Sequence, residues 1–283
     1  MFEKVEAFHR PTSIREAIRL LEGGTGRAEV VAGGTDLVVA ANSTTRILID
    51  ITHAGLSYIR KASGACAIGA TTTMAELEAS IVIRGLAGGI LARAAATCGS
   101  VQIRNVATLG GNLANGSSAA DVAPVLLALD ATVVSADPNG RRQLPVAEYR
   151  KLVRSLLIEV LVPNPPGGKR CGWSFQKLGR TALDISLVNV AAGLQVDASQ
   201  RVKWARIALG AVAPKAIRMA TVEEHMKGRM LSAVSIAEAA EGVMRAVRPI
   251  TDIRASADYR REMSGVLVRR ALGECAAQAG VAL

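Results

Sequence analysis

The sequence predicts an α+β protein of two domains, and three observations support this prediction. The first part of the chain alternates helical segments with short β-branched runs, which is typical of αβ units. The clearest break is Asn-Pro-Pro-Gly-Gly at residues 164–168. Beyond it, alternating runs precede helical stretches, an order that indicates an α+β domain. We expect a first domain over residues 1–170, with lobes of about 1–55 and 56–170, and a second over residues 171–283.

Helices and strands of the first domain are expected from capping residues and periodicity. Ser13 and Glu16 form a capping box for a helix that ends at Gly23-Gly24, and Thr73 and Glu76 form another box. The other segments follow from apolar runs and helix propensity. They are strands at 29–32, 46–51, 67–69, 131–136 and 156–162, and helices at 83–97 and 122–129.

The second domain is expected to hold an antiparallel sheet of three strands. Alternating runs extend from Trp173 to Lys177, from Leu187 to Val196 and from Lys203 to Val212. Helices from Val234 to Val247 and from Tyr259 to Ala271 would cover one face of this sheet.

Composition restricts the classes of function. The chain has 283 residues, of which 50% are hydrophobic and 20% charged, as in a folded globular protein. Aromatic residues make up only 3%, so stacking platforms for nucleic acid are scarce and the net charge of +10 needs another explanation. The C-terminal arginines either form a solvated helix face or dock acidic partner subunits. They are Arg245, Arg248, Arg254, Arg260, Arg261, Arg269 and Arg270.

Cysteines and histidines are too dispersed to bind a metal. Cys66, Cys98, Cys171 and Cys275 form no C-x-x-C pair, and the three histidines are equally scattered. Free thiols and the absence of a signal peptide favour the cytoplasm. No membrane span is expected, because Asp130 interrupts the longest apolar run.

Two glycine-bearing turns are the strongest functional signal. The first is Val30-Val31-Ala32-Gly33-Gly34-Thr35-Asp36-Leu37, where a strand ends and a helical run to Ala41 begins. The second is Thr108-Leu109-Gly110-Gly111-Asn112, and Asp121 follows nine residues later. A strand, a glycine turn and a helix start direct several backbone N–H groups to one spot, which suits a pyrophosphate. Either turn alone is equally a plain tight connection. Two turns with a downstream carboxylate favour a site for an anionic dinucleotide.

These residues resemble the FAD-binding medium subunit of the molybdenum hydroxylases, the family of xanthine dehydrogenase and aerobic carbon monoxide dehydrogenase. The resemblance covers essentially the whole chain and lies in an ordered set of segments. They are Ala32 to Leu37, Ile68 to Thr72, Gln102 to Asn105 with Thr108 to Asn112, Asp121, Phe175 to Lys177 with Arg180 and Asp184, and Asp252 to Arg254 with Tyr259 and Arg260.

The resemblance implies a two-lobed FAD-binding domain of the PCMH type, followed by a C-terminal domain with a three-stranded sheet and helices. It implies that the first turn holds the cofactor's pyrophosphate through backbone N–H groups, with a hydroxyl from Thr35. It places Thr108, Gly110, Gly111 and Asn112 near the phosphates and the ribityl chain. Some relatives stack an aromatic ring on the flavin from the segment around Cys98, where this chain has none.

Three further positions are implied, each with an alternative. Asp121 would accept hydrogen bonds from a cofactor hydroxyl, or it is a helix N-cap. Ile158 would lie near a ring of the cofactor, or it belongs to the strand core. Lys177 would place a cation near the flavin and favour its reduced, anionic form, or it is a surface lysine.

The function that the resemblance implies is that of an electron-transfer flavoprotein subunit. Electrons from a large molybdopterin-binding subunit would pass through [2Fe-2S] clusters of a small subunit to FAD and then to an external acceptor, within a dimer of heterotrimers. No residue of this chain would then serve as catalytic acid or base. The alternatives are a self-contained FAD oxidase or reductase of the same cofactor fold, and a basic nucleic-acid-binding or scaffold protein.

Overall fold

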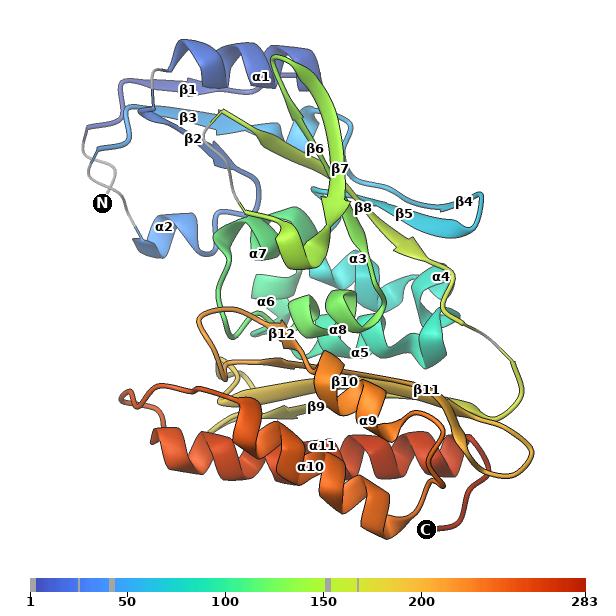
Figure 1. The fold of residues 1–283 in the computed structure, drawn as a ribbon. Coiled ribbons are helices and arrows are strands. Elements are labelled where there is room, and N and C mark those ends of the chain that lie inside the picture. Colours follow the sequence, from blue (N-terminus) through green and yellow to red (C-terminus); the bar gives the residue numbers. More distant parts are fainter. Residues whose placement is uncertain (1–3, 25, 41–43, 151–153, 167) are drawn as a thin grey trace. The chain divides into compact units, whose positions relative to one another are not determined.

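The computed structural model describes residues 4–24, 26–40, 44–150, 154–166 and 168–283. The chain forms two compact units. Figure 1 shows the ribbon coloured along the sequence from the N-terminus to the C-terminus. The first unit comprises Met1–Val82, Ser100–Gly116 and Asp130–Pro163. The second comprises Ile83–Gly99, Ser117–Leu129 and Asn164–Leu283. Two stretches from the middle of the sequence therefore belong with the C-terminal half.

The first unit contains two sheets. A parallel sheet has the strand order β1-β3-β2, with β1 (Ala7–His9), β3 (Ile47–Asp50) and β2 (Ala28–Val31). An antiparallel sheet has the order β4-β5-β8-β6-β7. Its strands are β4 (Ile59–Ala62), β5 (Ala65–Gly69), β8 (Leu156–Pro163), β6 (Thr132–Asp137) and β7 (Gly140–Pro145).

One hydrophobic core joins α1 (Ile14–Gly23) to both of these sheets. The Ser13 hydroxyl caps α1 by accepting the Glu16 N–H at 3.2 Å. The buried face of α1 packs with Ile49 of β3 and with Ile158 of β8. Each such buried side chain contributes about 1.5–3 kcal/mol. This core fixes the ends of β2 and β8, which line the candidate site described below.

Short helices complete the first unit. They are α2 (Leu37–Ala40), α3 (Met74–Ala79), α6 (Val101–Arg104), α7 (Leu109–Asn115) and 3₁₀ turns at Ile51–His53 and Val146–Glu148. Helix α4 (Ile81–Arg84) spans the sequence boundary between the two units.

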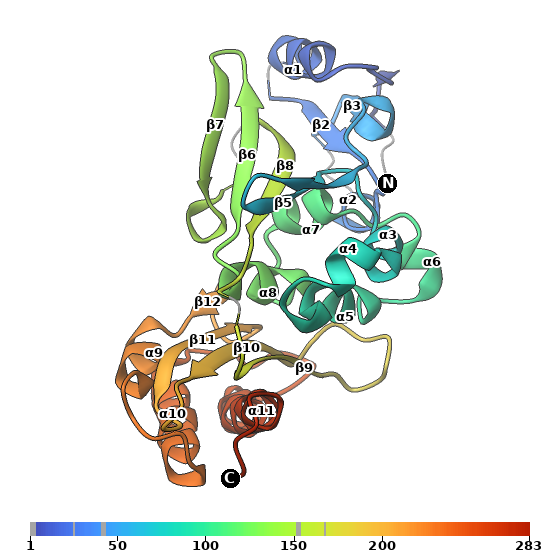
Figure 2. The same cartoon turned by 90° about the vertical axis from the view of Figure 1, so that its right-hand side faces the viewer.

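The second unit is a four-stranded antiparallel sheet between two helical layers (Figure 2). The strand order is β12-β11-β10-β9, with β9 (Cys171–Leu178), β10 (Val188–Val196), β11 (Val202–Gly210) and β12 (Ile217–Arg218). One face packs with α9 (Ala220–Met226), α10 (Ala233–Ala246) and α11 (Ala257–Gln278). Helices α5 (Ile90–Ala96) and α8 (Val122–Ala128) contact the same sheet and form the other layer.

The structure corrects several expectations. The prediction of three C-terminal strands was wrong, because β12 has only two residues and is too short to show alternation. The expected helix at 83–97 is divided into α4, a 3₁₀ turn at Ala87–Gly89 and α5, where the backbone is left-handed at Gly88 and Gly89 (φ 60° and 76°).

Further elements were not anticipated from the sequence, namely β1, β4, β7, β12, α6, α7 and α9. Strand β7 is an exposed edge strand with a polar sequence, so it lacks the apolar alternation that identifies a half-buried strand. Ala41, the expected end of the first helical run, lies outside the described residues, as does Gly167 of the expected break.

Candidate functional site

The first glycine turn leaves a row of backbone amides without partners. It follows β2 and leads into α2, and Gly34 adopts a φ of 70°, which costs glycine little because it has no Cβ. Within the parts of the chain that the structure describes, no N–H group of residues 33–37 donates a hydrogen bond. Consecutive unpaired N–H groups in such a turn form an anion-binding arrangement. Thr35 is half-buried in the same turn and adds a hydroxyl.

This turn also packs against the segment that leads into the second turn. A Cβ at Gly33 would lie 1.9 Å from the carbonyl oxygen of Val106. The sequence pattern indicates that Gly33 is needed for the approach of a ligand. The structure shows a different requirement, because two segments of the chain's own backbone meet there.

The second turn uses its amides internally. Thr108 is the N-cap of α7, and its hydroxyl accepts the Gly111 N–H at 3.1 Å. The Gly110 N–H donates to the carbonyl oxygen of Ala70 at 2.8 Å. A Cβ at Gly110 would lie 2.7 Å from Ala70, whereas a Cβ at Gly111 would meet only the Thr108 hydroxyl, at 2.9 Å. Gly111 therefore presents bare backbone on the open side of α7.

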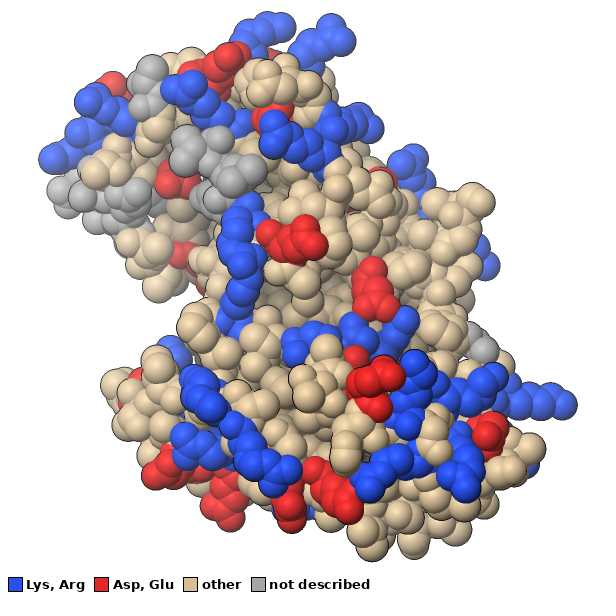
Figure 3. All heavy atoms as spheres, in the orientation of Figure 1, with Lys and Arg blue, Asp and Glu red and all other residues tan. Residues whose placement is uncertain are grey.

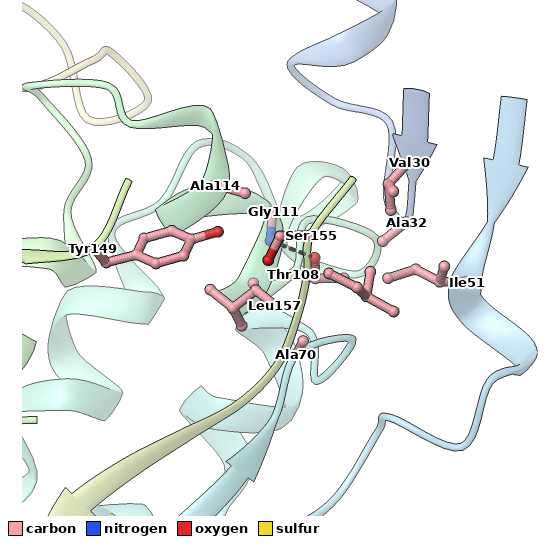
Figure 4. A pocket seen from close by; sticks show the side chains of 12 residues that line it. Val30, Ala32, Ile51, Ala70, Thr108, Gly111, Ala114, Tyr149, Ser155 and Leu157 are labelled. Atoms are coloured by element: carbon pink, nitrogen blue, oxygen red, sulfur yellow. Dashed lines mark hydrogen bonds between the residues drawn. The ribbon is translucent and has the colours of Figure 1, made fainter. Parts of the chain in front are cut away.

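Beside both turns lies a recess with about 490 Å³ of empty space, partly open to solvent (Figure 4). Its lining is mostly apolar, with bare backbone at two glycines and three hydroxyl groups. The lining residues are Val30, Ala32, Ile51, Ala70, Thr108, Gly110, Gly111, Ala114, Tyr149, Ser155, Leu156 and Leu157.

Tyr149 and Ser155 are the polar residues of this recess that the sequence did not reveal. The Tyr149 ring is directed toward Gly111 in the view of Figure 4. Burial raises the pKa of Tyr149 to about 12, so its phenol stays a hydrogen-bond donor at neutral pH. Neither hydroxyl has a hydrogen-bond partner among the described residues. No local pattern links these residues to the glycine turns, because only the pairing of β8 within the sheet brings them there.

These surfaces together fit an elongated dinucleotide. The unpaired amides suit an anionic diphosphate, and the apolar recess suits a flat ring. Asn112 on α7 has a buried side-chain oxygen, Oδ1, for which the described chain supplies no donor. A cofactor hydroxyl would satisfy this acceptor. Across the described ranges, no three His, Cys, Asp or Glu side chains are grouped so as to hold a metal ion.

The structure brings Asp121 and Lys177 together within the second unit. Lys177 Nζ donates to Asp121 Oδ2 and to the Thr97 carbonyl oxygen, both at 2.8 Å. The Lys177 and Asp121 side chains are 9% and 7% exposed. Asp121 stands at the start of α8 but makes no side-chain capping bond. Asp121 therefore occupies the N-cap position without a capping bond, and the alternative of a surface lysine does not describe the buried Lys177.

Ile158 lies in the hydrophobic core of the first unit and is 3% exposed. Its neighbours Leu156 and Leu157 line the recess instead. Ile158 is therefore a strand-core residue, which was the alternative interpretation. Contact of Ile158 with a cofactor ring stays a prediction, and the burial of the side chain does not favour it.

The first turn also carries three predicted site residues with side chains that differ in burial. Val31 ends β2 and Leu37 begins α2, and both are half-buried. Asp36 is more exposed, yet partial burial raises the pKa of its carboxyl above the usual value. A carboxylate thus adjoins the unpaired amides.

Most C-terminal arginines have partners within the chain. Arg260 is only 3% exposed and donates to Asp252 at 2.7 Å, which makes it a structural residue. Three others pair with nearby acids, namely Arg245 with Glu241, Arg254 with Asp252 and Arg261 with Asp258. Figure 3 shows basic and acidic side chains intermingled on one face. Among the described residues, Arg269 and Arg270 are exposed and have no ion-pair partner.

Comparison with known proteins identifies the class to which this fold and site belong. The family model described as the FAD binding domain in molybdopterin dehydrogenase matches residues 2–165. The model described as the CO dehydrogenase flavoprotein C-terminal domain matches residues 173–275. The chain therefore belongs to the FAD-binding subunits of the molybdopterin dehydrogenases. It is the flavoprotein subunit of a multi-subunit oxidoreductase.

Individual relatives match along nearly their whole length. Subunit alpha of the 6-hydroxypseudooxynicotine dehydrogenase complex of Paenarthrobacter nicotinovorans is 34% identical, over 93% of this chain and 91% of the relative. The carbon monoxide dehydrogenase medium chain of Hydrogenophaga pseudoflava is 30% identical, over 94% and 95%.

Solved structures agree with this relationship. A chain of carbon monoxide dehydrogenase from Hydrogenophaga pseudoflava superposes with a TM-score of 0.91 at 29% identity, covering 98% of this chain and 99% of that one. A chain of quinoline 2-oxidoreductase from Pseudomonas putida 86 gives a TM-score of 0.89 at 26% identity, covering 99% of each.

Among the described residues, no helix combines the length and the apolar character needed to cross a membrane.

Proposed function

We propose that this chain carries electrons from [2Fe-2S] clusters of a partner subunit, through its FAD, to an external acceptor. The observation that carries the proposal is the row of unpaired N–H groups at residues 33–37 beside an apolar recess. Family membership supports it over a self-contained oxidase or a nucleic-acid-binding protein. A bound flavin takes up and releases electrons singly or in pairs, so it can join one-electron centres to a two-electron acceptor.

The residues of the first unit would bind the phosphates and one ring. The amides of residues 33–37 and the Thr35 hydroxyl would hold the diphosphate, with Val31, Ala32 and Leu37 as its supporting frame. Thr108 and the backbone of Gly110 and Gly111 would line the second side of the cofactor. Asn112 Oδ1 would accept a hydrogen bond from a cofactor hydroxyl. Tyr149 and Ser155 would donate to polar atoms of the ring or sugar that enters the recess.

The residues of the second unit would act on the flavin end. Lys177 would place its charge near the isoalloxazine and favour the reduced, anionic form. Asp121 would hold the ammonium group of Lys177 and would also accept a hydrogen bond from a cofactor hydroxyl. No residue here needs to act as catalytic acid or base, because the organic substrate would react on another subunit.

The proposed partners are a large molybdopterin-binding subunit and a small [2Fe-2S] subunit, in a dimer of heterotrimers within the cytoplasm. The exposed pair Arg269 and Arg270 would contribute to docking them. Domain boundaries near residues 55 and 170 belong to the same proposal. They differ from the two compact units, in which residues 83–99 and 117–129 group with the C-terminal half.

The test is to assemble the complex with a variant whose FAD binding is weakened, and to compare the complexes after unbound FAD has been removed. A Gly111→Val chain is co-produced with the partner subunits, and a Gly23→Ala chain serves as control because a Cβ there meets nothing within 4 Å. We expect substrate to reduce the iron–sulfur clusters in both complexes, while the external acceptor is reduced only by the control. Unchanged acceptor reduction by the FAD-free complex would contradict the proposal.

A further inference from the structure

Asp121 is held on the side opposite to Lys177 by two side chains of the second unit. Ser186 donates its hydroxyl to Asp121 Oδ1 at 2.5 Å, and Asn189 donates from Nδ2 to the same oxygen at 3.1 Å. The Asn189 Nδ2 group also contacts the Ser186 oxygen at 3.2 Å. Ser186 and Asn189 are fully buried, each with 0% exposure. Three separate segments of the chain therefore meet at one carboxylate.

The surrounding backbone leaves space for this arrangement. A Cβ at Gly210 of β11 would lie 2.2 Å from Asn189 Oδ1, so any larger residue would displace the amide. Asn189 Nδ2 also lies 3.4 Å from the carbonyl oxygen of Ala120, the residue before Asp121. The amide is thereby anchored to both the side chain and the preceding backbone of its acceptor.

Two donors on one carboxylate oxygen determine where the other oxygen points. The last side-chain torsion of an aspartate is broad, so an unanchored carboxylate rotates easily. With Oδ1 held by Ser186 and Asn189, Oδ2 stays directed at Lys177 Nζ, 2.8 Å away. Lys177 otherwise has a flexible four-carbon stem, and its Nζ also donates to the Thr97 carbonyl oxygen.

We propose that Ser186 and Asn189 are positioning residues that set the redox potential of the flavin by fixing Asp121 and, through it, the charge of Lys177. The inference rests on the proposed function, in which Lys177 faces the flavin. Removing the Ser186 hydroxyl takes away the shorter of the two hydrogen bonds to Asp121 Oδ1, so the carboxylate rotates more easily and Lys177 is held less firmly. Reduced, anionic flavin is then less favoured, so the midpoint potential becomes more negative.

The experiment measures the midpoint potential of the full chain loaded with FAD. Ser186→Ala should shift the reduction equilibrium at least tenfold toward oxidised flavin, which is about 30 mV for a two-electron couple. Ser186→Cys keeps a weaker donor of similar size and should give a smaller shift of the same sign. The matched control is Ser174→Ala, because Ser174 is equally buried on β9 and donates at 2.5 Å to a different carboxylate, Glu274.

A double-mutant cycle distinguishes positioning from general loosening of the fold. In a Lys177→Met background, Ser186→Ala should no longer change the potential, because the charge it positions is gone. If Ser186→Ala still shifts the midpoint potential in this background, the inference is overturned. An equal shift of the midpoint potential in Ser174→Ala also overturns it. Neither result contradicts FAD binding by the chain. If Lys177→Met itself leaves the potential unchanged, the placement of Lys177 is wrong and the inference falls with it. Failure of the wild-type chain to bind FAD overturns the proposed function.

Discussion

At the first glycine turn the amides of residues 33–37 lack partners in the described chain, whereas at the second turn the amides of Gly110 and Gly111 donate to Ala70 and Thr108. The first turn is therefore equipped to bind an anion directly. The second turn is a capped helix start that offers a surface without side chains. A Gly-Gly pair in a sequence does not by itself distinguish these two uses.

Substitution of Gly33 is expected to have the largest effect of the changes considered, and this effect is a loss of folding stability. In Gly33→Ala the new Cβ would lie 1.9 Å from the Val106 carbonyl oxygen, which cannot move without shifting backbone. We expect the free energy of unfolding to fall by about 3 kcal/mol. Denaturant unfolding of the apoprotein measures this, with Gly23→Ala as control. Equal stability of the two variants would show that the turns are not packed together.

Substitution of Gly111 is expected to separate binding from folding. In Gly111→Val the new Cβ would meet only the Thr108 hydroxyl within the protein, at 2.9 Å, and Gly111 lines the recess. FAD affinity should fall at least about tenfold, which is about 1.4 kcal/mol. Unfolding free energy should change by less than about 1 kcal/mol. Titration of the apoprotein with FAD tests this expectation, and an unchanged dissociation constant would remove Gly111 from the site.

Tyr149→Phe tests whether the recess beside the second turn binds part of the cofactor. Loss of one hydrogen bond should weaken FAD binding about fivefold, or about 1 kcal/mol. Burial raises the pKa of Tyr149 to about 12, and burial together with Glu159 raises the pKa of Tyr58 to about 12. The unfolded chain ionises these phenols at lower pH than the folded chain, so stability should fall as pH rises from about 10 to 12.

Tyr58→Phe is the matched control for this experiment. Each variant should lose less stability than the wild type between about pH 10 and 12, because one phenol no longer resists ionisation. Only Tyr149→Phe should weaken FAD binding. An equal loss of affinity in both variants would indicate a general effect on the first unit rather than a contact in the recess.

Asp36→Asn is expected to have the smallest effect and to refine the account of the first turn. Partial burial raises the pKa of Asp36, so the folded chain retains its proton to higher pH than the unfolded chain. Stability of the wild type relative to the variant should therefore rise as pH falls through this raised pKa toward 3.8. At neutral pH, removing the carboxylate beside the diphosphate should tighten FAD binding about twofold. Weaker binding by the variant would instead assign Asp36 an attractive contact.

Much of the fold could be predicted where the signal was local. The capping box at Thr73 is present as expected, because capping depends on residues only three positions apart. At Ser13 only half of the expected box forms, because the Ser13 hydroxyl accepts the Glu16 N–H while the Glu16 carboxylate accepts the N–H of Thr12. The edge strand β7 was missed because its polar sequence has no apolar alternation, and β12 was missed because two residues are too few to show any alternation.

The sequence alone determined the glycine turns, the family and its cofactor, because spacing and residue type are read directly along the chain. Tertiary structure decided that Gly33 packs against Val106, that Tyr149 and Ser155 line the recess, and that Ser186 and Asn189 hold Asp121. These contacts join residues that lie tens of positions apart. Such meetings depend on strand pairing and helix packing, which no local pattern specifies.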